Sequence, residues 1–133
     1  MNSRSYDIIT VGGGLGGCAV AKSMAERGAR VLVLEAETRF RDQVRGEAIM
    51  PWGVAEAQEL GIYDAIMESA GHHLSWWDNY HGPRRTSHID LPKVTPQGTP
   101  VVTFYHPRRQ EVMVEAAESA GAEVRRGARV SAV

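Results

Sequence analysis

The chain has 133 residues, enough for one compact domain and too few for two of typical size. Hydrophobic residues make up 43% and charged residues 23%, which excludes a disordered or fibrous protein and predicts a packed core. Because 15 basic residues oppose 16 acidic ones, the formal net charge is −1, and no overall field favours nucleic acid or an anionic membrane.

The cysteine content and the N-terminus indicate where the protein resides. A single cysteine, Cys18, excludes an internal disulfide and a multi-thiolate metal site within one chain. The first residues are polar and the longest apolar stretches have the length of a strand, so we expect neither a signal peptide nor a membrane span. These features predict a protein of a reducing compartment, and we place it in the cytoplasm.

The first third of the chain predicts a βαβ unit. Residues 8–11 form a short apolar run that stops at a glycine cluster, as a buried parallel strand does before its turn. Small and apolar residues then recur at helical spacing over residues 15–27, and Gly28 stands where a helix C-terminal glycine belongs. A second apolar strand over residues 31–34 ends at Glu35. These parts span about thirty residues, the size of a βαβ unit.

The middle of the chain alternates between helical and extended patterns. We predict helices over residues 52–60 and 63–70, each followed by a glycine. Residues 72–105 contain four of the six prolines, and we interpret them as a β-excursion with loops and strands. The strands are expected near residues 74–80 and 101–105.

The last segment predicts a helix over residues 107–120, with Pro107 as its first residue and an apolar stripe along one face. Residues 122–126 and 129–133 have strand patterns. The predicted fold class is therefore α/β: a Rossmann-like parallel sheet with helices on both faces, interrupted by the β-excursion. Because the last strand coincides with the final residue, we expect the N-terminal part of a longer polypeptide. Its unpaired strand edges would favour self-association.

The sequence from Gly12 to Gly17 satisfies the pattern Gly-x-Gly-x-x-Gly, and each glycine has a mechanical reason. Gly12 permits the tight turn out of the strand, Gly14 permits close approach of a pyrophosphate, and Gly17 permits close packing of helix and sheet. The phosphates would lie at the helix N-terminus, where free amides and the helix dipole favour negative charge. Glu35 stands 18 positions beyond Gly17, near the spacing expected for a carboxylate that binds ribose hydroxyls and repels a 2′-phosphate. The residues expected to bind the ADP half of a dinucleotide are Gly12, Gly14, Leu15, Gly16, Gly17, Glu35 and Ala36.

Residues 8–35 resemble the N-terminal fingerprint of the FAD-containing glutathione-reductase-like superfamily. The later segments resemble its flavin monooxygenase branch, typified by para-hydroxybenzoate hydroxylase and related to flavin-dependent halogenases and geranylgeranyl reductases. That second resemblance rests on two motifs, each leading a helix that ends at a glycine. The motifs are Arg45-Gly46-Glu47 and Pro107-Arg108-Arg109-Gln110.

The resemblance implies that FAD is the cofactor and that two arginines reach it. Arg45 matches a family arginine that contacts the ribose and pyrophosphate, a task that suits a planar, permanently charged guanidinium. Arg109 matches a polar residue at a helix start that approaches the flavin. The alternatives are Arg39 and Arg41 for the first position, and Arg108 and Gln110 for the second.

Other conspicuous residues receive no catalytic role. The five histidines have no ligand spacing that indicates a metal, so we predict none. Trp76 and Trp77 lie where relatives extend a strand toward the substrate domain, and one of them could line a substrate pocket. We interpret Cys18 as a buried packing residue, and Glu47 has no visible partner for acid or base catalysis.

The resemblance covers residues 1–133 as the N-terminal part of an FAD-binding domain, with residues 72–105 extending toward a substrate domain. It implies a flavin-dependent oxidoreductase, preferentially a monooxygenase that hydroxylates a small organic substrate and uses NAD(P)H. The family's second FAD motif, a Gly-Asp, lies later than this chain extends, so we expect the isolated chain to be inactive and to bind FAD weakly or not at all. An NAD-binding dehydrogenase domain and a non-enzymatic binding or assembly module stay open as alternatives.

Overall fold

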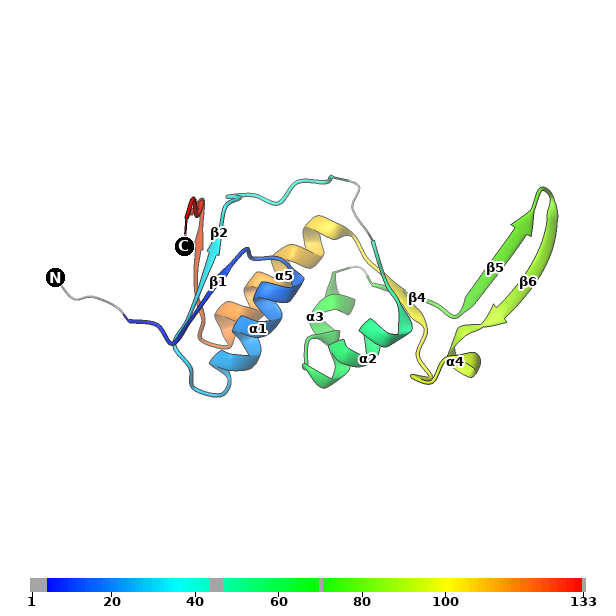
Figure 1. The fold of residues 1–133 in the computed structure, drawn as a ribbon, viewed down its shortest axis with the longest axis horizontal. Helices are drawn as coiled ribbons and strands as arrows, with labels where there is room; N and C mark the ends of the chain where they lie inside the picture. Colours follow the sequence, from blue (N-terminus) through cyan, green and yellow to red (C-terminus); the bar gives the residue numbers. More distant parts are fainter. Residues whose placement is uncertain (1–4, 44–46, 70, 133) are drawn as a thin grey trace.

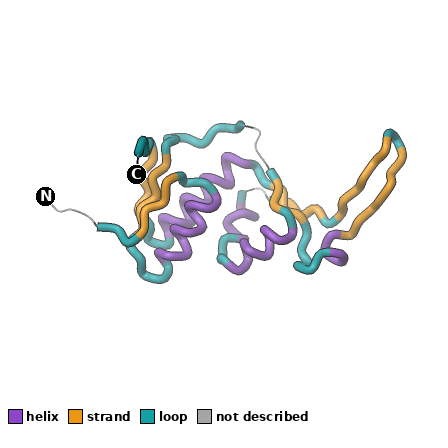
Figure 2. The backbone as a smooth tube through the Cα atoms, viewed as in Figure 1, coloured by secondary structure: helices purple, strands orange, loops and turns teal. Residues whose placement is uncertain are grey.

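A computed structural model describes residues 5–43, 47–69 and 71–132 of the chain. Three parts follow one another along its longest axis: a parallel sheet covered by two helices, a smaller antiparallel sheet with two further helices, and a projecting hairpin (Figures 1 and 2). The parallel sheet and its helices, together with the smaller sheet, contribute to one hydrophobic core.

The parallel sheet contains the predicted βαβ unit. Strand β1 (Ile8–Val11) leads through the glycine turn into helix α1 (Leu15–Ala25), and β2 (Val31–Glu35) returns parallel to β1. The third strand, β8 (Glu123–Arg126), pairs in parallel with the other edge of β2, giving the order β1-β2-β8. The α/β fold with a parallel sheet is thus confirmed. Helix α1 ends two residues earlier than predicted, and Gly28 has the expected positive φ of 86°.

Two helices pack on one face of this sheet. Helix α1 and helix α5 (His106–Ser119) contact each other and the strands beside them, and their buried side chains include Met113, which is fully enclosed. On the opposite face Ile9 and Val11 are 56% and 61% exposed. The prediction of helices on both faces is therefore wrong for the described residues. The apolar run of β1 suggested burial on both sides, but only alternate side chains of this strand face the helices.

A smaller antiparallel sheet joins the parallel sheet through α5. Its strands are β3 (Ala48–Ile49), β7 (Val101–Thr103) and β4 (His72–Leu74), in the order β3-β7-β4. Helices α2 (Pro51–Glu59) and α3 (Tyr63–Glu68) connect β3 to β4, close to the predicted ranges. Strand β3 was not predicted, because two residues carry no periodic pattern.

A long hairpin projects from the end of the molecule opposite the parallel sheet (Figure 1). Strands β5 (Trp76–His81) and β6 (Arg84–Asp90) pair in antiparallel register with a bulge, and the short helix α4 (Leu91–Val94) follows. Together with β4 and β7 they lie within the range predicted as a β-excursion. Strand β6 was not recognised, because its polar sequence lacks the apolar alternation of a half-buried strand.

The predicted strand over residues 129–133 does not form in the part that is described, residues 128–132. After β8 the chain turns at Gly127, whose φ is 71°, and leaves the sheet. A single backbone bond remains, from the Ala128 amide to the Glu35 carbonyl at 2.9 Å. Residue 133 lies outside the described residues.

Candidate functional site

The glycine turn between β1 and α1 is closed by a backbone contact that only glycine permits. Gly12 has a φ of 102°, and its amide donates to the Leu34 carbonyl at 2.8 Å. A Cβ added to Gly17 would lie 2.0 Å from the Gly12 carbonyl oxygen. The first turn of α1 therefore rests directly on the end of β1, as the motif predicts for its first and last glycines.

The N-terminus of α1 is open in front of this turn. A Cβ added to Gly14 or Gly16 would meet no atom within 4 Å. No side chain caps the helix, and its first intrahelical bond runs from the Cys18 amide to the Gly14 carbonyl at 3.0 Å. The amides of the residues between them have no helical acceptor, so this helix end fits a phosphate group without any basic side chain.

Glu35 joins the ends of both strands of the βαβ unit. It is the last residue of β2 and is 8% exposed. Its Oε2 accepts from the Gly13 amide at 2.6 Å and its Oε1 accepts from the Glu37 amide at 2.7 Å. The predicted carboxylate is thus in contact with the glycine turn, and Ala36 follows within the same bend.

A cavity of about 320 Å³ lies beside this carboxylate. One wall is the carboxyl end of β2 with the segment after it, and the other is the first turn of α5. Its lining residues are Glu35, Glu37, Phe40, Arg41, Gln43, His106 and Gln110. The fold therefore brings the predicted acidic residue next to the predicted helix start, although the two are 71 positions apart in the sequence (106 − 35).

Arg109 is buried one turn into α5, with an exposed fraction of 6%. Its guanidinium carbon lies 4.8 Å from the centre of the Phe104 ring, and its Nη2 is 3.2 Å from Nδ1 of His106, which lines the cavity. Its Nε has no partner in the described chain. Burial lowers the pKa of Arg109, because the charged form loses solvation.

Cys18 lies between the glycine turn and Arg109. Its buried Sγ donates to the Gly13 carbonyl at 3.2 Å. Burial, followed by the negative charge of Glu35, raises the pKa of this thiol to about 11. The thiol is therefore a protonated packing group that holds the turn, in keeping with its interpretation as a packing residue.

Arg126 and Glu111 form an ion pair that the sequence did not indicate, and Arg126 also contacts Phe40, which lines the cavity. Arg126 is the register partner of Glu35 across β2 and β8, and its guanidinium carbon lies 5.0 Å from the Phe40 ring centre. Two bonds of 2.6 and 3.0 Å join it to the carboxylate of Glu111 on α5. Since strand register is not encoded in a local pattern, no signal in the sequence could have found this pair.

The other predicted residues are separate from the cavity or outside the described residues. Arg45 falls within residues 44–46, which are not described. Two of the residues named as alternatives, Arg41 and Gln110, line the cavity. Trp76 and Trp77 are half-exposed on the hairpin, at the far end of the molecule (Figure 1).

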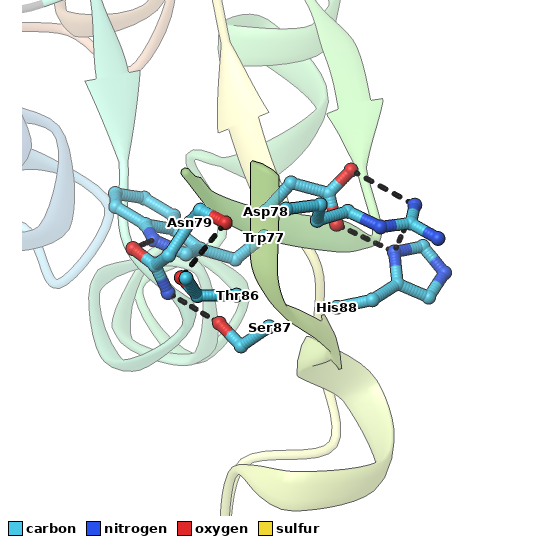
Figure 3. A network of polar contacts seen from close by, with 7 residues as sticks. Trp77, Asp78, Asn79, Thr86, Ser87 and His88 are labelled. Atoms are coloured by element: carbon cyan, nitrogen blue, oxygen red, sulfur yellow. Dashed lines mark hydrogen bonds and ion pairs between the residues drawn. The ribbon is translucent and has the colours of Figure 1, made fainter. Parts of the chain in front are cut away.

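The hairpin carries its own polar network (Figure 3). The Asp78 carboxylate lies 2.5 Å from Nδ1 of His88, and the imidazole stacks on Trp76 at 4.1 Å. The bond from His88 lowers the pKa of Asp78. Within the described ranges no group of three His, Cys, Asp or Glu residues could hold a metal ion, and no helix is long and apolar enough to cross a membrane.

A parallel βαβ unit with an open helix end and a carboxylate at the end of its second strand defines a dinucleotide-binding fold. Residues 5–133 match the family described as FAD binding domain. The chain belongs to this family, and its cofactor is FAD.

Relatives and solved structures support the same assignment. Squalene epoxidase erg1 of Schizosaccharomyces pombe is 32% identical over 87 residues, which cover 65% of this chain and 19% of that protein. Squalene monooxygenase SE2 of Panax ginseng is 39% identical over 64 residues, covering 48% and 12%. The chain thus spans less than a fifth of the length of these relatives.

Among solved structures, p-nitrophenol 4-monooxygenase PnpA of Pseudomonas putida is similar with a TM-score of 0.76 and 25% identity, over 90% of this chain and 31% of that chain. PqsL of Pseudomonas aeruginosa, a probable FAD-dependent monooxygenase, has a TM-score of 0.78 over 96% of this chain and 34% of its own. At 19% identity, the likeness to PqsL shows the fold alone.

Proposed function

We propose that this chain is the FAD-binding portion of a flavin-dependent monooxygenase and that it holds FAD by the ADP half. The observation that supports this most strongly is the contact between the Glu35 carboxylate and the Gly13 amide, beside an uncapped helix N-terminus. When bound and reduced, the flavin would be the group that reacts with oxygen, so that chemistry belongs to the cofactor. The residues of this chain bind and orient it.

The pyrophosphate binds at the N-terminus of α1. Free amides between Gly14 and Cys18 donate to its oxygens, and the missing Cβ of Gly14 leaves room for close approach. Glu35 accepts from the ribose hydroxyls. Each of its oxygens takes one backbone bond in this structure, and a carboxylate offers about four acceptor positions, so capacity remains for the ribose.

Arg45 and Arg109 are the proposed basic contacts. Arg109 is already placed by Phe104 and His106, and its unpaired Nε is a donor for which a bound anion would provide an acceptor. Arg41 and Gln110 line the cavity and are the alternative contacts on its two walls.

The reaction of the whole protein is proposed from its relatives. The similar proteins include a squalene epoxidase and a p-nitrophenol 4-monooxygenase, whose names indicate quite different organic molecules. We propose an organic substrate, NAD(P)H as the reductant and a cytoplasmic location. The half-exposed Trp76 and Trp77 are proposed to face the substrate side.

Gly14→Ala is a specific test of this binding mode. A Cβ at this position meets no protein atom, so the variant is expected to fold like the wild type and to lose most FAD binding, measured by flavin fluorescence titration. Val20→Ala, an exposed change on the same helix, serves as the control and should bind FAD normally. Equal FAD affinity in Gly14→Ala and wild type would contradict the proposed pyrophosphate site.

A further inference from the structure

His106 is the first residue of α5 and lines the cavity beside Glu35. The bond between it and Arg109 fixes the state of its ring. A guanidinium has donors only, so the 3.2 Å contact from Arg109 Nη2 requires Nδ1 of His106 to be an acceptor. The imidazole in this arrangement is neutral at Nδ1, with its proton on Nε2.

Among the described residues, His106 is the hydrogen-bond acceptor for the buried Arg109 side chain. The side chain is 6% exposed, its flat face covers Phe104, and its Nε lacks a partner in the described chain. Cation–π contact holds the plane of the guanidinium but does not fix its rotation within that plane. The hydrogen bond to His106 fixes the rotation of the guanidinium within its plane.

We propose that neutral His106 is a positioning residue that holds the guanidinium of Arg109 beside the cavity that His106 itself lines. Protonation of Nδ1 converts the acceptor into a donor, breaks the bond and places two cations side by side. Arg109 then loses the hydrogen bond that orients its guanidinium. This inference rests on the proposed function, since it concerns the residue proposed to contact FAD.

Charged groups on the other wall face the same cavity. Glu35 and Glu37 favour a protonated imidazole, whereas Arg41 opposes it together with Arg109. Among the described residues the hydrogen bonds of the Glu35 carboxylate come from the Gly13 and Glu37 amides, whereas the Arg109 guanidinium donates to His106. The switch between the two states of His106 is therefore expected to act on Arg109 directly.

The pair can be tested without cofactor by NMR of the chain labelled with ¹⁵N in histidine and arginine. We expect the His106 ring to carry its proton on Nε2 at pH 8, and the Arg109 side-chain signals to shift on acidification with the same midpoint as that ring. His106→Gln keeps an acceptor that does not titrate, and should abolish this shift. His81→Gln, an exposed change on the hairpin, should leave it intact.

A His106 ring protonated on Nδ1 at pH 8, or Arg109 signals that ignore its titration, would overturn the proposal. A parallel FAD titration measures the consequence: the affinity of the wild type should weaken about five-fold between pH 8 and pH 5.5, the effect of one hydrogen bond. His106→Gln and Arg109→Gln should each remove this dependence. If the wild-type chain binds no FAD at any pH, the NMR result alone decides the pairing of His106 and Arg109.

Discussion

The Gly13 amide and the Glu35 carboxylate lie 2.6 Å apart, and this bond connects the turn after β1 with the end of β2. The two residues are 22 positions apart, yet each depends on the other for its geometry. A Cβ on Gly13 would lie 3.1 Å from Oε2, so the glycine also gives the carboxylate its space. Glu35 therefore both fixes the geometry of the glycine turn and is the residue proposed to bind the ribose.

Glu35→Gln should weaken binding of FAD and ADP by roughly 10-fold or more, because charge-assisted hydrogen bonds contribute about 1.5–3 kcal/mol. It should also reduce discrimination against an ADP analogue with a 2′-phosphate, since the repelling charge is gone. Affinities from calorimetric titration of both ligands test this. Glu37→Gln, on the same cavity, is the control; a larger loss in that variant would contradict the role of Glu35.

Gly17→Ala should destabilise the fold by about 3 kcal/mol or more, because its Cβ would overlap the Gly12 carbonyl and backbone cannot move aside cheaply. Gly16→Ala is the matched control. Its Cβ meets nothing, and alanine is the better helix former, so its stability should equal the wild type or exceed it by up to about 1 kcal/mol. Chemical denaturation measures both. Similar stabilities for the two variants would refute the close contact.

Cys18 should resist thiol reagents in the folded protein, because it is buried and its pKa is raised to about 11. A raised pKa stabilises the fold below the ordinary value of 9.0, and that contribution is lost as pH rises toward 11. The melting temperature of the wild type should therefore fall more steeply over this range than that of Cys18→Ala. Rapid labelling of the native thiol at pH 8 would show that the group is accessible.

The Glu111–Arg126 pair should make the fold sensitive to acid. The bond to Arg126 lowers the pKa of Glu111 below its ordinary value of 4.5, so its stabilisation is present above that pH and is lost as pH falls through the folded value. Glu111→Gln should cost on the order of 1 kcal/mol at pH 7, and this cost should shrink as pH falls through the folded-state pKa of Glu111. Glu115→Gln, in the exposed pair with Arg108, is the control for a general charge effect.

Much of the fold was predictable where the pattern is local. The glycine turn, Glu35 and the helices around Val54, Ile66 and Met113 follow from apolar spacing and glycine punctuation within a few residues. The hairpin was recognised only in part, because β6 is stabilised by pairing with β5 and by side-chain bonds such as Asp78 with His88, not by burial. Burial patterns alone cannot reveal such a strand.

Only the side of the cavity formed by Glu35, which belongs to the dinucleotide-binding motif, was predictable from the sequence. Glu35 lies in the motif, whereas His106 and Phe40 reach the same cavity through a parallel crossover that residue spacing does not encode. Arg126 reaches Phe40 through a strand register that local spacing does not encode either. The predicted Arg109 is close by, but its link to His106 depends on a side-chain orientation. Its contact with FAD stays a prediction.

Thermal unfolding of the chain with increasing FAD, ADP or NAD tests the central claim most directly. A ligand that binds only the folded state stabilises it by RT ln(1 + [L]/Kd), so the melting temperature rises with ligand concentration and even weak affinity is measurable at roughly millimolar ligand. We predict that FAD and ADP raise the melting temperature and that NAD, which carries the same ADP group, raises it less than FAD does. Stabilisation by NAD that equals or exceeds that by FAD would contradict a fold that is specific for FAD.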